Sequence, residues 1–379
     1  MPPSVPHVRA VQSGSARVRL EAVRQFLHGV PPLAEALIVA ASRGAADDCA
    51  RAVAMTQGVA FGLHRLSVTQ VAARLAIADL AGQGRAAAGG LAYQAIVTRA
   101  AFDAAADDAL DCFAPVRHLP GFPRALARTL TELRLERVTA AQLTALGRSG
   151  PDLADLLARI EALLDAAGGS DRAALFEAAL AGLERSRDYA AMPVVLLDVP
   201  LESAMESQLL LALAARAPRA LFTLPDGDAD ARRTLDRAGI VVEARDEPGD
   251  TDLVRLHRVL FAGEPPSTRD RTGELIWLSA PGEARECVEI ARRLLQEASR
   301  GVRFDEMAVL LRSPEPYLGL LEHALDRAGI PAHFEHGTRR PALPVIASDV
   351  RAADESRVFC PVLRRRRDHR MAQWRRYRT

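Results

Sequence analysis

Short apolar runs that alternate with helical patterns constrain the fold of this chain more than any other feature. The run Ala36–Ala40 is long enough for one buried strand, and it leads through the turn Ser42-Arg43-Gly44 into a predicted helix, Ala45–Gln57. A strand, a small-residue turn and a helix in this order are typical of the start of an α/β nucleotide-binding unit. A second short segment, Val59–Val68, leads into a predicted helix that begins near Thr69, its expected N-cap. Further strands are predicted at Pro193–Asp198, Arg219–Leu224 and Ile240–Glu243, and helices at Glu202–Arg216, Glu283–Ala298 and Glu315–Ala328. Between them, six apolar residues from Leu153 to Leu164 fall on one face of a predicted helix.

The length of 379 residues predicts two or three domains. We expect an N-terminal helical segment over 1–32, with a helix at Arg17–His28. A first α/β domain over 33–83 and 191–265 is expected to be interrupted by a helical insertion over 84–190. A partial second α/β domain is expected over 270–347, with strands at Glu274–Leu278 and Met307–Leu311.

The predicted tail, 348–379, has a different character. Its last sixteen residues contain eight arginines and no periodic apolar pattern. Such a segment cannot bury enough apolar surface to offset the entropy of ordering, so we expect disorder. An out-of-frame stretch of a GC-rich coding sequence has the same composition, and that alternative stays open.

The chain contains no lysine, and all 49 basic residues are arginine. A phosphate-binding P-loop needs a lysine, a Schiff-base enzyme needs a lysine amine, and the PD-(D/E)xK nuclease motif ends in lysine. None of these three sites can therefore be built from this chain alone. We also expect no bound cofactor and no metal site.

The cellular location is predicted from three features that the sequence lacks: a CxxC pair, a membrane helix and a secretory signal. The four cysteines are scattered without a CxxC pair, which indicates reduced thiols in the cytoplasm. No apolar run approaches the ~20 residues of a membrane helix, and the N-terminus does not read as a secretory signal. We therefore expect a cytoplasmic protein without a membrane partner.

Three segments resemble the second motor domain of UvrD-like superfamily 1 helicases. They are Ala280–Cys287, Phe304–Ser313, which resembles helicase motif IV, and Leu321–Pro331. The first half of the chain is similar to the N-terminal part of AddB, the B subunit of AddAB-type helicase–nucleases in the PD-(D/E)xK nuclease family. The resemblance covers roughly residues 15–345.

The resemblance implies two RecA-like, P-loop NTPase-like units, the second incomplete, with an inactivated ATP site. The family's GxGKT loop falls on residues 42–46, where only Gly44 matches and alanine stands in the lysine position. Asp198 matches the first Walker B acid, but Val199 replaces the catalytic glutamate. Arg312 matches the motif IV arginine. Gly44, Asp198 and Arg312 are thus expected to be a vestigial nucleotide site, with no catalytic residue.

The resemblance also suggests a DNA contact. His64, Arg65 and Ser67 are similar to the Thr-x-His-Ser motif that touches single-stranded DNA in these helicases. Alternatively, His64 caps a strand end and Arg65 lies on a solvated face. Arg124 and Arg128 have helical spacing, which an ordinary exposed helix face explains equally well.

These observations together predict the non-catalytic, helicase-like portion of a double-strand break repair subunit, ending before the nuclease domain. Its expected partners are DNA and an AddA-like motor helicase–nuclease subunit. The alternative is a catalytically silent protein–protein scaffold without DNA affinity.

Overall fold

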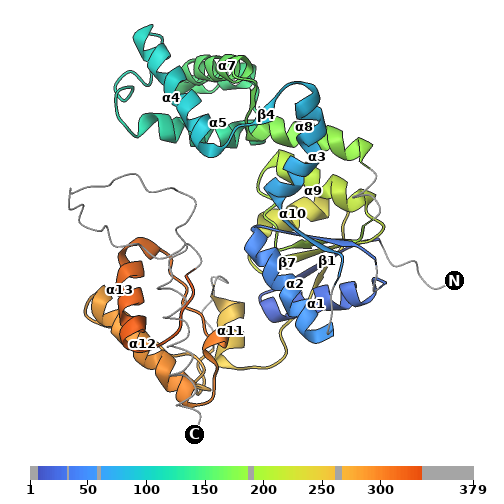
Figure 1. The fold of residues 1–379 in the computed structure, drawn as a ribbon, viewed down its shortest axis with the longest axis vertical. Coiled ribbons are helices and arrows are strands. Elements are labelled where there is room, and N and C mark those ends of the chain that lie inside the picture. Colours follow the sequence, from blue (N-terminus) through green and yellow to red (C-terminus); the bar gives the residue numbers. More distant parts are fainter. Residues whose placement is uncertain (1–6, 32–33, 58–60, 187–191, 261–266, 335–379) are drawn as a thin grey trace, which may run out of the picture. The chain divides into compact units, whose positions relative to one another are not determined.

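The computed structural model describes residues 7–31, 34–57, 61–186, 192–260 and 267–334. The chain divides into two compact units, one reaching to Leu275 and one beginning at Ile276. Figure 1 shows the elements of both units, which are described separately below. The predicted tail, 348–379, lies outside the described residues.

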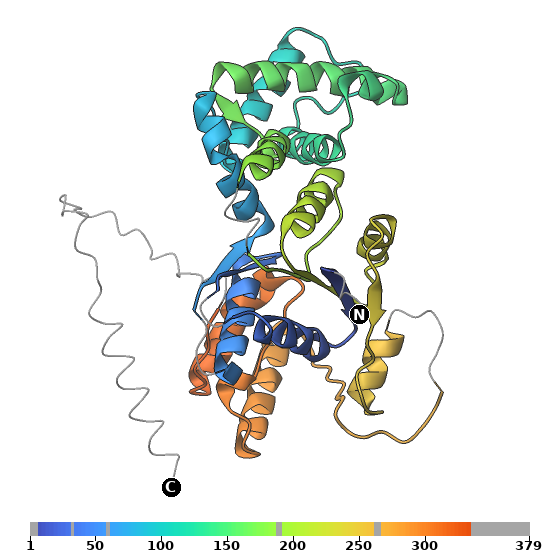
Figure 2. The same cartoon turned by 90° about the vertical axis from the view of Figure 1, so that its right-hand side faces the viewer.

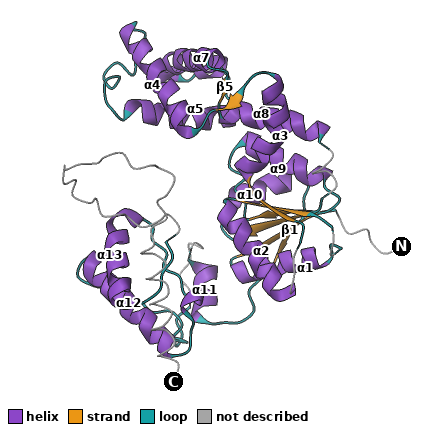
Figure 3. Cartoon of the chain, in the orientation of Figure 1, coloured by secondary structure: helices purple, strands orange, loops and turns teal. Residues whose placement is uncertain are grey.

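A six-stranded sheet with only parallel pairings forms the centre of the first unit (Figure 3). The strand order is β3-β2-β6-β7-β1-β8. The strands are β1 (Val8–Ser13), β2 (Ala36–Ala40), β3 (Leu63–Ser67), β6 (Val194–Leu197), β7 (Ala220–Pro225) and β8 (Val242–Ala244). The α/β class is therefore confirmed for this unit, and β2 has the predicted bounds.

Helices cover both faces of this sheet (Figure 2). On one face, α1 (Ala16–His28) and α2 (Arg43–Gln57) pack against strand residues such as Ile38 and Val195. On the other face, alternate strand residues such as Leu196 and Phe222 pack against helices. Those helices are α3 (Val68–Gly82), α8 (Arg172–Arg185), α9 (Ala204–Arg216) and α10 (Ala229–Arg237). Two buried faces explain why the strands are continuous apolar runs.

The helical insertion has a hydrophobic core of its own. It contains α4 (Gly90–Ala106), α5 (Phe122–Leu135), α6 (Ala140–Thr144), the 3-10 turn Gly147–Ser149 and α7 (Gly150–Ala166). The predicted apolar face of α7 is confirmed, since Leu156 and Ile160 are fully buried. The short parallel strands β4 (Ala86–Ala87) and β5 (Gly169–Ser170) pair at its base. Helix α8, which was assigned to the insertion, packs instead with α3 in the core beside the sheet.

Strand β1 was not predicted, because residues 1–32 were expected to be helical. The predicted helix is present as α1, but Val8–Ser13 form a strand between β7 and β8. The strand is short and carries Arg9 and Gln12, so its apolar pattern is weak. Its stability comes from partners more than 200 residues away in sequence, which local patterns do not report.

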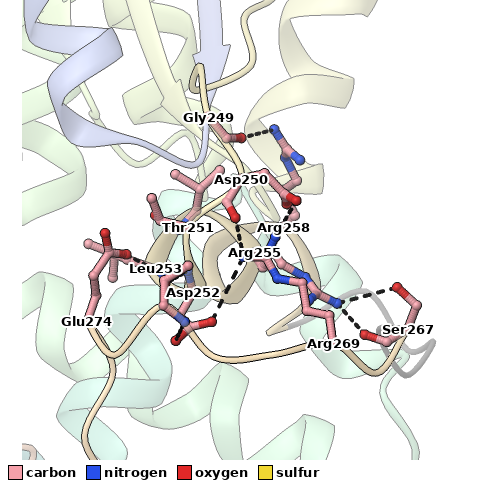
Figure 4. Close-up of polar contacts among 12 residues, drawn as sticks. Gly249, Asp250, Thr251, Asp252, Leu253, Arg255, Arg258, Ser267, Arg269 and Glu274 are labelled. Atoms are coloured by element: carbon pink, nitrogen blue, oxygen red, sulfur yellow. Dashed lines mark hydrogen bonds and ion pairs between the residues drawn. The ribbon is translucent and has the colours of Figure 1, made fainter.

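Near the end of the first unit, a network of hydrogen bonds and ion pairs surrounds α11 (Asp252–Val259), as Figure 4 shows. The Asp252 carboxylate accepts hydrogen bonds from the backbone N–H groups of Thr272 (2.9 Å) and Gly273 (3.0 Å). The Thr272 hydroxyl in turn accepts from the N–H of Asp252 at 2.9 Å. Arg269 pairs with Asp250. These bonds hold segment 267–274 against α11.

In the second unit, α12 (Glu283–Ser299) and α13 (Pro314–Arg327) have nearly the predicted bounds and pack around Cys287 and Leu321. A 3-10 turn, Phe304–Glu306, lies between them. The strands predicted at Glu274–Leu278 and Met307–Leu311 are absent from the described part of this segment, 267–334. The side chain of Val309 packs on the helices, whereas that of Leu310 is 93% exposed. Only one side of this segment is therefore buried. A strand needs a paired neighbour, and the described residues provide none here.

Candidate functional site

The carboxyl edge of the parallel sheet is the first place to look for a ligand site. In open α/β sheets, ligands bind outside the carboxyl ends of the strands, at the point where successive connections leave in opposite directions. Here β2 connects outward to β3 through α2, whereas β6 connects the other way to β7 through α9. The switch point therefore lies between β2 and β6, where the segments carrying Gly44 and Asp198 begin.

An ion pair between Arg19 and Asp198 occupies this edge. Arg19 projects from α1 and its side chain is 9% exposed. Its Nε atom donates to Oδ1 (2.9 Å) and Oδ2 (3.1 Å) of Asp198, and its Nη2 atom donates to Oδ2 at 3.0 Å. Its Nη1 atom donates to the backbone carbonyl of Ser13 at 2.5 Å. One guanidinium thus joins the ends of β1 and β6.

Thr223, on strand β7, adds two hydrogen bonds to Asp198. Its hydroxyl donates to Oδ1 of Asp198 at 2.7 Å and accepts from the backbone N–H of Asp198 at 3.0 Å. Asp198 has a φ of 45°, in the left-handed region that most residues avoid. Both carboxylate oxygens are therefore engaged inside the protein, so a Mg²⁺ ion would have to displace Arg19 to bind this group.

The turn between β1 and α1 is short and closely packed. Only Gly14 and Ser15 separate the strand from the helix. A Cβ atom on Gly14 would lie 3.1 Å from Oδ2 of Asp226 and 3.5 Å from Cβ of His257. A loop that cradles phosphates presents several free N–H groups to the ligand. The Asp226 carboxylate beside this two-residue turn repels an anionic ligand.

Cys49 lies on α2 below this edge and is buried. Burial, and next the nearby Asp198 carboxylate, raise the pKa of its thiol to about 11, although Arg24 opposes this rise. The thiol is therefore protonated at neutral pH. A protonated, buried thiol is neither a nucleophile nor a metal ligand.

The predicted phosphate-loop residues begin helix α2. Ser42 caps the helix, because its hydroxyl accepts from the N–H of Ala45 at 3.2 Å. Gly44 lies exposed in the first helical turn. Gly44 and Asp198 thus follow the adjacent strands β2 and β6. Arg312 belongs to the second unit, where it is exposed immediately before α13.

The predicted DNA-contact residues all lie on strand β3, at one edge of the sheet. Nε2 of His64 lies 3.5 Å from the Glu35 carboxylate, and it is buried without a hydrogen-bond partner in the described part of the chain. Nε of Arg65 lies 3.5 Å from Oδ1 of Asp47. Strand β3 therefore presents one imidazole and one guanidinium, each beside a carboxylate.

Ser67 has a structural role that the sequence analysis missed. Its hydroxyl accepts from the N–H of Gln70 at 3.3 Å, and the Gln70 side chain accepts from the N–H of Ser67 at 3.0 Å. This reciprocal pair is a capping box at the start of α3. The predicted cap, Thr69, is wrong by two residues. The spacing Ser67-x-x-Gln70 was the available signal.

A cleft runs between α2 and β3. It is lined by Arg43, Asp47, Ala50, Arg51, Ala54, Phe61, Gly62, Leu63 and Arg65. The lining contains three arginines and one carboxylate, that of Asp47. Asp47 pairs with Arg43 at 3.6 Å and with Arg65. Arg51 pairs with Asp48 at 2.8 Å, and the Phe61 side chain is largely exposed. Arginine beside an exposed aromatic ring is typical of surfaces that bind single-stranded nucleic acid.

Some site types are not found in the described residues. They contain no group of three or more His, Cys, Asp or Glu side chains placed to hold a metal ion. None of the helices described here is long and apolar enough to cross a bilayer.

Comparison of the chain with known protein families and with curated proteins finds no match. The resemblance to AddB-type subunits therefore stays a prediction from the motifs.

Proposed function

We propose that this chain is the non-catalytic, helicase-like portion of a double-strand break repair subunit. It binds single-stranded DNA, and it acts with an AddA-like motor subunit that supplies the ATP hydrolysis. The observation that carries the proposal is the Arg19–Asp198–Thr223 cluster. Because Arg19 and Thr223 hydrogen-bond the Asp198 carboxylate, this carboxylate is less available to a metal ion, which supports a chain that does not hydrolyse ATP.

The DNA-binding part of the proposal rests on the cleft between α2 and β3. Arg43, Arg51 and Arg65 line it with the exposed ring of Phe61. Their carboxylate partners are exposed or half-exposed, and such surface pairs contribute only about 0–1 kcal/mol. Backbone phosphates would therefore compete with these carboxylates at little cost.

The second candidate is a protein–protein scaffold without DNA affinity. It is favoured by the same ion pairs, because each arginine of the cleft already has a carboxylate neighbour. Met55, which is 84% exposed on α2, and Phe61 would then contact a protein partner.

A salt titration of single-stranded DNA binding separates the two candidates. Fluorescence anisotropy with labelled oligo-dT would be measured for the full chain and for Arg51→Ala. Loss of one phosphate contact should lower the slope of log K against log salt by about 0.7. Arg99→Ala is the matched control, since Arg99 is similarly exposed and also paired with a helical aspartate, Asp103. Equal slopes for both variants would contradict DNA binding at the α2–β3 cleft, and no binding at low salt would leave only the scaffold.

A further inference from the structure

The chain that connects the two units is attached to α11 just before the units divide. Segment 267–274 ends one residue before the boundary between them. Its contacts with α11 are part of the network in Figure 4. At its start, the carbonyl of Ser267 accepts a hydrogen bond from Arg255. At its end, the Glu274 carboxylate accepts from the backbone N–H of Leu253 at 3.5 Å. Both ends of the segment are therefore bound to the same helix of the first unit.

The Asp252 carboxylate binds the segment between these two ends. It accepts hydrogen bonds from two successive backbone N–H groups, those of Thr272 (2.9 Å) and Gly273 (3.0 Å), and Arg269 lies 4.0 Å from it. Gly273 has a φ of 86°, which is open to glycine but strained for other residues. The Asp252 side chain is 13% exposed. One carboxylate thus selects one backbone conformation of the segment.

This attachment involves no apolar side chain of the segment. Residues 267–274 are all polar, charged or glycine, and all are exposed. Hydrogen bonds and ion pairs at an exposed surface each contribute little net stability, because water competes for the same groups. Helix α11 has support of its own, since Val254 is buried and its backbone N–H is capped by the Thr251 hydroxyl. The segment can therefore detach while the helix stays folded.

We propose that segment 267–274 is a latch that sets the length of the tether between the two units. With the latch closed, the tether is residues 275–282, which contain no helix or strand and can span at most about 30 Å. With the latch open, the tether runs from the end of α11 to the start of α12, residues 260–282, and can span about 80 Å. Opening therefore widens the range of motion of the second unit without refolding either unit. The latch uses no residue of the α2–β3 cleft, so it does not depend on the proposed function.

Limited proteolysis of the full chain with trypsin, read by mass spectrometry, tests whether the latch opens. Arg269 and Arg271 are cleavage sites within it. Asp252→Ala should speed cleavage after both residues by roughly three- to tenfold, because it removes the acceptor of two backbone N–H groups. Asp230→Ala is the matched control, since Asp230 is also an acidic residue in the first turn of a helix, α10, and pairs only within that helix in the described residues.

Two further readouts separate an opened latch from an unfolded helix. Thr272→Val leaves every residue of α11 unchanged and removes only the hydroxyl that accepts from the N–H of Asp252, so it should give a smaller increase in the same cleavage. Cleavage after Arg258, within α11, should stay at the rate of the unchanged protein in both variants. Small-angle X-ray scattering of Asp252→Ala should show a maximum dimension larger by up to about 50 Å, the gain in tether length.

The inference is overturned if trypsin cleaves after Arg269 and Arg271 equally fast in the unchanged protein and in Asp252→Ala. It is also overturned if cleavage after Arg258 rises by the same factor in Thr272→Val, because the helix and the segment would then open together. Faster cleavage in the latch with an unchanged maximum dimension would show that the segment detaches without lengthening the tether, which contradicts the proposed role.

Discussion

Replacing Arg19 by methionine tests how firmly the carboxyl edge of the sheet is closed. Methionine keeps much of the apolar stem but removes the donors to Asp198 and to the Ser13 carbonyl. Removing one partner of a buried ion pair costs about 3–5 kcal/mol of unfolding free energy. The Asp198 side chain is 33% exposed, so water partly solvates the carboxylate that remains. We therefore expect Arg19→Met to lower the stability of the first unit by about 2–3 kcal/mol.

Asp198→Asn and the double variant complete the cycle. Asparagine tolerates the positive φ of this position and keeps an oxygen for Thr223, but it leaves Arg19 with a neutral partner. We expect a similar loss for Asp198→Asn. The double variant should be less destabilised than the sum of the single changes, by about 1–3 kcal/mol, because the two residues share one interaction.

Urea denaturation followed by far-UV circular dichroism measures these free energies. The sheet and helices of residues 7–260 contain no tryptophan, so far-UV circular dichroism reports on them more directly than fluorescence does. Hydrogen exchange of peptides from β6 and β7 should locate the loss at the carboxyl edge. The reasoning is refuted if Arg19→Met costs less than about 1 kcal/mol, or if the two changes add within about 0.5 kcal/mol.

Three further predictions concern the same unit. Gly182→Ala should destabilise it by about 1–3 kcal/mol in urea denaturation, because the new Cβ would lie 2.0 Å from the Leu75 carbonyl oxygen, where α8 meets α3; a neutral result would mean that the helices are not so close. Ser67→Ala should cost about 1 kcal/mol through loss of the capping box, and Ser15→Ala should cost less, because the Ser15 side chain makes no cap bond; equal costs would argue against the cap. Folding raises the pKa of the Cys49 thiol from 9.0 to about 11. The stabilisation that this shift gives is therefore complete below pH 9 and is lost as the pH rises toward 11. Cys49→Ala should flatten the decline of unfolding free energy in this pH range, by up to roughly 2–3 kcal/mol.

Much of the fold follows from local sequence patterns. Strand β2 and helices α1, α9 and α13 lie within two residues of their predicted bounds, because each has a complete apolar pattern and clear end signals. The patterns fail where partners decide the outcome. Strand β1 is stabilised by distant strands, whereas Met307–Leu311 has strand periodicity but no pairing neighbour among the described residues.

The candidate site was less predictable than the fold. Asp198 was identified from the resemblance, but nothing near Arg19 in sequence distinguishes it from the other helical arginines. Its burial depends on a carboxylate 179 positions away. A single sequence predicts residue types at helix faces, but not which of them meet across the fold.

Calorimetric titration of the full chain with Mg²⁺·ATP, paired with a phosphate-release assay, shows whether Asp198 belongs to a working nucleotide site. Because Arg19 and Thr223 hydrogen-bond both oxygens of Asp198, we expect no phosphate release and no binding that depends on Asp198. ATP hydrolysis that is lost in Asp198→Ala would contradict the proposed inactivity, because it would show a working nucleotide site at the carboxyl edge of the sheet.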